Sequence, residues 1–160
     1  MPRIMKQILT MIRSILSDKR LILYGLLLST LHLIGMIILY DIVPEFDLVT
    51  HFLFGFVISK YTSRGAYSIG LHDSLTEKLR KHKRFTRSSR HVDLLIRLSG
   101  FLLIGGLMWE SAEFFIGPLI WRPPDPFFTL PINLHNIDGA KDVTIGAVGS
   151  IVAWYKEAFQ

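Results

Sequence analysis

The chain of 160 residues contains no cysteine. Disulfide bonds, thiolate metal sites and a cysteine nucleophile are therefore excluded, and any bound metal ion must be held by oxygen or imidazole ligands. The paired Glu-x-x-His motifs of di-iron carboxylate proteins are also missing. In the most basic stretch, residues 72–91, aromatic residues do not alternate with the cations, so nucleic acid is not an expected partner.

What the chain has in excess is apolar residues, which make up 50% of it and occur in long blocks. Such a composition is unusual for a soluble domain and predicts an integral protein of the plasma membrane, surrounded by the lipid bilayer. Of the 18 Lys and Arg residues, 15 lie in the N-terminal segment or between Lys60 and Arg97. The positive-inside rule then predicts that both termini and this basic stretch are cytoplasmic.

The predicted fold is all-α: a polytopic bundle of four transmembrane helices with an N-terminal amphipathic helix. Spans are expected at about 21–43, 47–61, 94–116 and 137–155, judged against a hydrocarbon core of ~30 Å. Residues 1–20 place apolar side chains at helical spacing among basic ones, which favours a helix on the membrane surface, although a basic extension of the first span is an equal alternative. Residues 62–93 are expected as a basic cytoplasmic loop, with anionic lipid headgroups as secondary partners. Continuation of the second helix through residues 61–70, past the membrane, is the alternative for the start of this segment.

Two carboxylates, Glu110 and Glu113, lie three residues apart in the third predicted span and therefore leave the same face of the helix. In the second span, Asp47, His51 and Gly55 recur every four residues. A carboxylate, an imidazole and a small residue thus share a face that we expect to point into the bundle. Because an ionisable group at membrane depth is costly without a partner, these residues are candidates for a functional site.

The fourth span adds two more carboxylates. Residues 143–155 alone would give ~20 Å of helix, which is too short to cross a membrane. The span is therefore expected to begin near residue 137 and to include Asp138 and Asp142, whose face continues through Gly149 and Ala153. In the predicted orientation, spans two and four begin and span three ends at the outer face, so the acids are expected to meet in the outer half of the bundle.

One histidine, His32, stands alone near the middle of the first predicted span. Intramembrane polar side chains often serve helix packing. We therefore interpret His32 as a neutral side chain that hydrogen-bonds to a neighbouring helix, in preference to a functional residue.

Five carboxylates gathered at one depth would carry a charge of −5, and like charges in a region of low dielectric cannot all ionise without compensation. Either protons are shared among them or divalent cations bind. Oxygen-rich ligation with one imidazole favours Mg²⁺, Mn²⁺ or Zn²⁺, with Ca²⁺ also open. The predicted metal ligands are Asp47, His51, Glu110, Glu113, Asp138 and Asp142, and the predicted catalytic residues among them are Glu110 and His51.

These residues also carry a resemblance. The motifs Asp47-x3-His51-x3-Gly55, Glu110-x2-Glu113 and Asp138-x3-Asp142 are similar to signatures of the YjdF-like family of small bacterial and archaeal membrane proteins, and more distantly to VanZ-like proteins. The similarity extends from about residue 46 to residue 153. It implies a small multi-span membrane protein that carries this acidic constellation, and it implies no particular reaction.

Three functions are open at this point. The first is a metal-dependent hydrolase or transferase that acts on a lipid or a lipid-linked phosphate, with Glu110 or His51 as general base. The second is a small cation- or proton-coupled transporter, in which the acids form a relay, although the chain has no evident internal repeat of spans. The third is a structural or partner-binding membrane protein, which would need none of the acids for chemistry.

Overall fold

The computed structural model describes residues 2–35, 38, 42–43, 45–81, 88–109 and 132–159, and only the backbone of residues 88 and 132–138. Throughout these ranges the chain forms helices and short turns, with no strand. The all-α prediction is confirmed for this part of the chain. The helices are α1 (Arg3–Leu16), α2 (Lys19–Ile34), α4 (Phe46–Ser68), α5 (Leu71–Arg80), α6 (Ser88–Phe101), η2 (Leu102–Trp109) and α8 (Ile132–Ala158).

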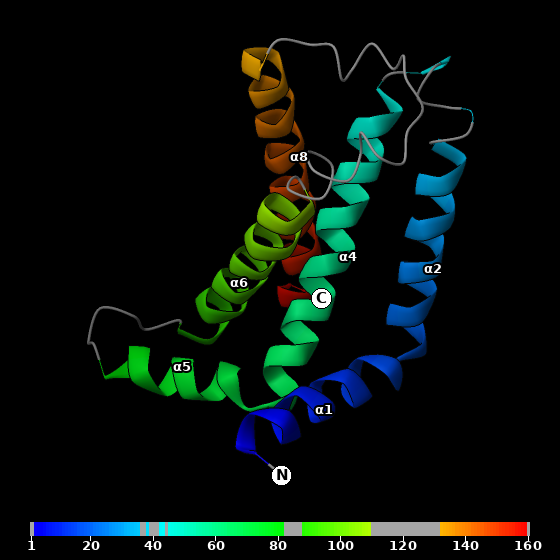
Figure 1. Ribbon diagram of the computed structural model, residues 1–160. Helices are drawn as coiled ribbons and strands as arrows, with labels where there is room; N and C mark the ends of the chain where they lie inside the picture. Colours follow the sequence, from blue (N-terminus) through cyan, green and yellow to red (C-terminus); the bar gives the residue numbers. More distant parts are fainter. Residues whose placement is uncertain are drawn as a thin grey trace.

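The long elements of the described chain run lengthwise, and two shorter helices, α1 and α5, lie across one end (Figure 1). The lengthwise elements are α2, α4, α6 with η2, and α8, while α1 and α5 lie across the end at which α2 and α6 begin and α4 ends. η2 is a segment of π-helix that continues α6. Within the described ranges, the one helix with the length and apolar composition to cross a membrane is Ser89–Trp109. The predicted count of four spans therefore stays a prediction.

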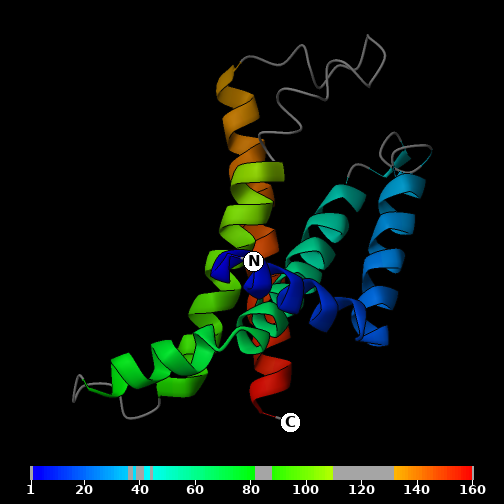
Figure 2. The same cartoon turned by 60° about the horizontal axis from the view of Figure 1, so that its bottom comes forward.

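The first helix, α1, has the amphipathic character expected of residues 1–20. None of its residues is buried, and apolar side chains such as Ile4 (70% exposed) and Leu16 (62% exposed) face away from the protein. Met11 lies against Gly65 of α4. The chain then turns at Asp18, whose Oδ1 accepts hydrogen bonds from the first amide groups of α2. Figure 2 shows α1 lying across the end of the bundle.

The central contact is between α4 and α8, which run in the same direction through the bundle (Figure 1). A Cβ atom on Gly55 of α4 would overlap the backbone of Gly146 of α8, and one on Gly149 would overlap the carbonyl oxygen of Phe52. Ser150 is fully buried between the helices and donates a hydrogen bond to the Gly55 carbonyl oxygen at 2.9 Å. Small residues therefore bring the two backbones into direct contact, as they do in membrane helix pairs.

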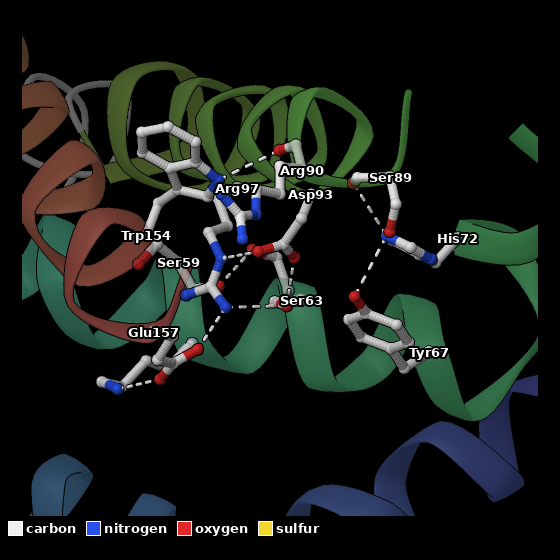
Figure 3. Close-up of polar contacts among 12 residues, drawn as sticks. Ser59, Ser63, Tyr67, His72, Ser89, Arg90, Asp93, Arg97, Trp154 and Glu157 are labelled. Atoms are coloured by element: carbon white, nitrogen blue, oxygen red, sulfur yellow. Dashed lines mark hydrogen bonds and ion pairs between the residues drawn. The ribbon is translucent and has the colours of Figure 1, made fainter. Parts of the chain in front are cut away.

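The segment 62–93, which the sequence analysis expects as a basic loop, is largely helical in the structure. α4 continues to Ser68, and a left-handed residue, Gly70 (φ 71°), separates it from α5. His72 is buried: its ring stacks on Tyr67 with 4.1 Å between centroids, and its Nε2 lies 3.2 Å from the Ser89 carbonyl oxygen of α6 (Figure 3). The many charged residues of this segment obscure α5 in the sequence. They occupy one face of the helix, while the other face packs on α6.

A polar cluster lies where α4, α6 and α8 meet, toward the end of the bundle that is near α1. Arg97 of α6 is buried, and its Nε donates to Asp93 Oδ2 at 2.9 Å. Glu157 of α8 accepts hydrogen bonds from both Arg97 and Lys60 of α4. Burial raises the pKa of the Glu157 carboxyl, but the hydrogen bonds and charges of Lys60 and Arg97 outweigh that effect and hold its pKa below the usual 4.5.

The helix contact predicts a strong difference between two glycine substitutions. Gly55→Ala should lower the free energy of unfolding by about 1–3 kcal/mol, because the new Cβ would meet backbone atoms that cannot move aside. Gly106→Ala is the matched control, since its Cβ would come no nearer than 3.6 Å to the side chain of Val143. Thermal unfolding in detergent should place Gly55→Ala well below Gly106→Ala, and equal midpoints would contradict the close contact.

The Glu157 contacts predict a pH dependence of stability. Because folding lowers the pKa of Glu157, the ionised carboxylate stabilises the folded state at pH values above its unfolded pKa near 4.5. This stabilisation is lost as the pH falls through the pKa of Glu157 in the folded state. The unfolding midpoint of the wild type should therefore exceed that of Glu157→Gln at pH 7, and the gap should narrow below about pH 4.5. Glu77→Gln is the control, because Glu77 pairs with Lys81 at the exposed surface and should show no comparable gap.

Candidate metal centre

Asp47 and His51 lie one turn apart on α4, at the end of the bundle opposite to α1. Asp47 is in the first turn of α4, where the helix dipole favours a carboxylate. The spacing of four residues directs both side chains to one face, and His51 Nε2 lies 3.4 Å from Asp47 Oδ1. The sequence alone therefore brings these two groups together.

The third member of the cluster, Asp142, comes from α8. Its Oδ2 lies 3.7 Å from His51 Nε2, and its side chain is 5% exposed, against 12% for His51 and 31% for Asp47. One ligand atom from each residue can be chosen so that all three lie within 4.8 Å of one another. The cluster is therefore shielded from solvent at Asp142 and more exposed to solvent at Asp47.

The distance between His51 and Asp142 is set by glycines that lie one turn further along each of the two helices. Gly55 and Gly146 bring the backbones of α4 and α8 into contact, and a Cβ on Gly146 would collide with the ring of Phe101 and approach the His51 carbonyl oxygen to 3.3 Å. Phe101 is itself buried between the helices. A larger residue at either glycine would push Asp142 away from His51.

The spacing of the three groups suits a bound ion. Ligand atoms that surround a tetrahedral ion at bond lengths of about 2.1 Å are about 3.4 Å apart. The observed nitrogen-to-oxygen distances of 3.4 and 3.7 Å lie near this value and exceed the 2.7–3.2 Å range of direct N–H···O hydrogen bonds. A protonated His51 between the two carboxylates would offset one of their two negative charges without a metal ion.

The structure describes only part of the predicted ligand set. It brings together Asp47, His51 and Asp142, which the sequence analysis draws from two separate spans. Glu110 and Glu113 lie outside the described residues. The backbone of Asp138 lies in α8 one turn before Asp142, and its side chain is not among those described.

A histidine that the sequence assigns to helix packing, His32, lies on α2 within electrostatic range of this cluster. The ring of His32 on α2 packs edge-on against Trp109 with 5.2 Å between centroids, and His32 interacts electrostatically with His51 and Asp47. Trp109 also ends the π-helical segment η2, directly before Glu110, and π-helical turns are frequent at functional sites. Only the fold reveals this placement, since His32 has no motif around it.

Comparison with known proteins adds one finding. The family described as "Predicted membrane protein (DUF2238)" matches residues 5–159. This description agrees with the YjdF-like resemblance at the level of protein class, and the YjdF-like name itself stays a prediction. No curated protein and no solved structure matches the chain.

Proposed function

Because the chain belongs to the DUF2238 family of predicted membrane proteins, we propose that it acts within a membrane by binding a divalent metal ion through Asp47, His51 and Asp142. The observation that carries this proposal is the convergence of three ligand atoms within 4.8 Å of one another, from two helices that are in backbone contact. Two carboxylates that are partly or fully withdrawn from water carry a charge of −2 beside a neutral imidazole. A divalent ion offsets that charge in full.

The chemistry of the donors limits the ion. Two carboxylate oxygens and one imidazole nitrogen favour Zn²⁺ or Mn²⁺, and Mg²⁺ fits if the further ligands are oxygen atoms. Glu113 and Asp138 are proposed as those further ligands, because Asp138 precedes Asp142 by one turn and Glu113 follows η2 in the sequence. Where only the three described residues bind, the ion has three protein ligands and an open position, which is typical of catalytic zinc centres.

The reaction that we propose is hydrolysis or transfer at a lipid phosphate or a lipid-linked phosphate. A bound divalent ion would polarise the phosphoryl oxygen and orient the attacking water. Glu110 would accept one proton of that water as the water oxygen bonds to phosphorus. The bond between phosphorus and the ester oxygen would break, and the released oxygen would take a proton from solvent water. His51 is proposed to hold the ion and to keep the two carboxylates apart. Placement in the outer half of the membrane, with both termini cytoplasmic, is part of the same proposal.

A second candidate function rests on the position of His51 between the two carboxylates. An imidazolium at 3.4 and 3.7 Å from Asp47 and Asp142 would form two ion pairs without any metal. His32 interacts electrostatically with His51 and Asp47, so titratable groups extend from α8 through α4 to α2. Such a chain suits a proton relay in a small cation- or proton-coupled transporter.

Metal content separates the two functions. Wild-type protein purified in detergent, loaded separately with Zn²⁺, Mn²⁺ and Mg²⁺ and then desalted, should retain about one equivalent of at least one ion by elemental analysis. Asp142→Asn should weaken that binding by about tenfold or more, because a charged ligand is lost. Asp73→Asn is the matched control: Asp73 lies at the surface of α5 with its side chain 86% exposed, and binding should be unchanged.

The folded state of Asp142→Asn is checked by its circular dichroism and thermal unfolding. Retention of metal by a folded Asp142→Asn protein at wild-type affinity would remove Asp142 from the site. Folded wild-type protein that binds none of the three ions and takes up protons as the pH is lowered would overturn the metal proposal in favour of the relay.

The proposed reaction makes a separate prediction about Glu110. If Glu110 acts as the base and not as one of the metal ligands that the sequence predicts, Glu110→Gln should leave metal affinity within about threefold. Phosphate release from a lipid phosphate in mixed micelles should fall by about 100-fold or more, as expected for loss of a general base. A loss of metal in Glu110→Gln would instead assign Glu110 to the ligands. Release of inorganic phosphate is measured with the metal-loaded wild type as reference. Equal release by Glu110→Gln and wild type would exclude Glu110 as the base while leaving the metal proposal standing.

A further inference from the structure

A cavity of about 550 Å³ lies at the end of the α4–α8 contact that is opposite to the candidate metal centre. Its walls come from α2, α4, α6 and α8, together with Asp18 at the turn between α1 and α2. A cavity of this volume is in the range of small-molecule sites. None of the sequence motifs discussed above falls within it.

Positive charge dominates the walls of this cavity. Five cationic and three anionic side chains line it: Arg20, Lys60, Arg64, Arg90 and Arg97, against Asp18, Asp93 and Glu157. The three anions already have partners inside the protein. Asp18 caps α2 through backbone amides, and Asp93 and Glu157 receive hydrogen bonds from Arg97.

Three of the five cations have no counter-charge in the described part of the protein. Within those ranges Arg20, Arg64 and Arg90 form no ion pair. Arg20 and Arg64 lie at the protein surface on α2 and α4, and the guanidinium of Arg90 lies 4.9 Å from the centroid of the Phe159 ring. The cavity therefore has a surplus of positive charge that the described protein does not neutralise.

The buried wall of the cavity has an unused hydrogen-bond donor. Arg97 is 3% exposed, and its Nη2 donates to Ser63 Oγ at 3.0 Å and to Glu157 (Figure 3). Its Nη1 is buried and has no hydrogen-bond partner among the described residues. A buried guanidinium donor without an acceptor is costly. An anion in the cavity would supply acceptors to the guanidinium groups.

We propose that this cavity binds a phosphate group. Arginine forks match the geometry of phosphate oxygens, and several arginines around one cavity are typical of phosphate recognition. Hydroxyl groups of Ser63 and Tyr24 line the same space, and Trp154 supplies an apolar wall. The chemistry fits equally a phosphate on a lipid headgroup and a phosphate on a water-soluble ester. The site is independent of the metal centre and does not rest on its function.

The lipid source has a structural argument in its favour. Asp18 and Arg20 line the cavity directly after α1, whose apolar side chains are exposed. If α1 lies on the membrane surface, as its amphipathic sequence predicts, the cavity is at the level of the lipid headgroups. The experiment offers the lipid phosphate and the water-soluble phosphate ester in separate arms, so that each arm tests one source.

Binding is measured with the full chain in neutral detergent. One arm titrates glycerol 3-phosphate by calorimetry, and the other compares nanodiscs of phosphatidylcholine alone with nanodiscs that contain phosphatidic acid. The test variant is the double substitution Arg20→Gln with Arg64→Gln, because neither residue takes part in the described ion pairs and folding should survive. The matched control is Lys78→Gln with Arg80→Gln on α5, which removes the same charge outside the cavity.

Wild-type protein should bind at least one of the two phosphate probes, and more weakly as salt rises. The Arg20→Gln/Arg64→Gln variant should weaken this binding by about tenfold or more, as expected for charge-assisted hydrogen bonds, while the α5 control stays within about twofold. Binding only to phosphatidic acid identifies a headgroup site, and binding only to glycerol 3-phosphate identifies a soluble ester. Failure of both probes, or equal loss in the α5 control, would overturn the proposal.

Discussion

The backbone contact between α4 and α8 fixes the rest of the structure. In a membrane, helices gain little from hiding apolar side chains, because lipid is apolar too, and they associate through close packing and interhelical hydrogen bonds. The Gly55–Gly146 contact and the hydrogen bond from Ser150 to the Gly55 carbonyl oxygen supply both. They also set the register of two parallel helices. With that register, Asp142 meets His51 at one end and Glu157 meets Lys60 at the other.

The two ends of this contact differ in how far the described protein balances its own charge. At the α1 end the carboxylates of Asp93 and Glu157 lie beside Lys60 and Arg97, so both of these acids have a cationic partner. At the other end two carboxylates share one imidazole, which is neutral unless it takes up a proton. Burial makes the unbalanced negative charge of the acidic cluster expensive. An anion suits the basic cavity and a cation suits the acidic cluster for the same electrostatic reason.

Sequence periodicity predicts much of this arrangement. Steps of four residues predict the face that carries Asp47, His51 and Gly55, and similar steps predict the face of α8, where Ala153 is fully buried. Periodicity did not predict α5, because the burial of His72 depends on a ring from α4. It also gave no sign of Arg97, whose partner Glu157 is 60 residues away in the chain. Patterns identify faces of helices, and only the fold says which faces meet.

The distance between the two ends decides whether they serve one ligand. His51 and Lys60 are nine residues apart on α4, which corresponds to roughly 14 Å of helix. A phosphate group bound beside Lys60 and Arg97 therefore cannot reach an ion held by His51, since metal–oxygen bonds are only about 2 Å long. The cavity and the candidate metal centre would therefore bind different molecules, or different parts of one extended molecule. Because one rigid contact joins them, a ligand that shifts α8 along α4 at one end would change the spacing of charged groups at the other.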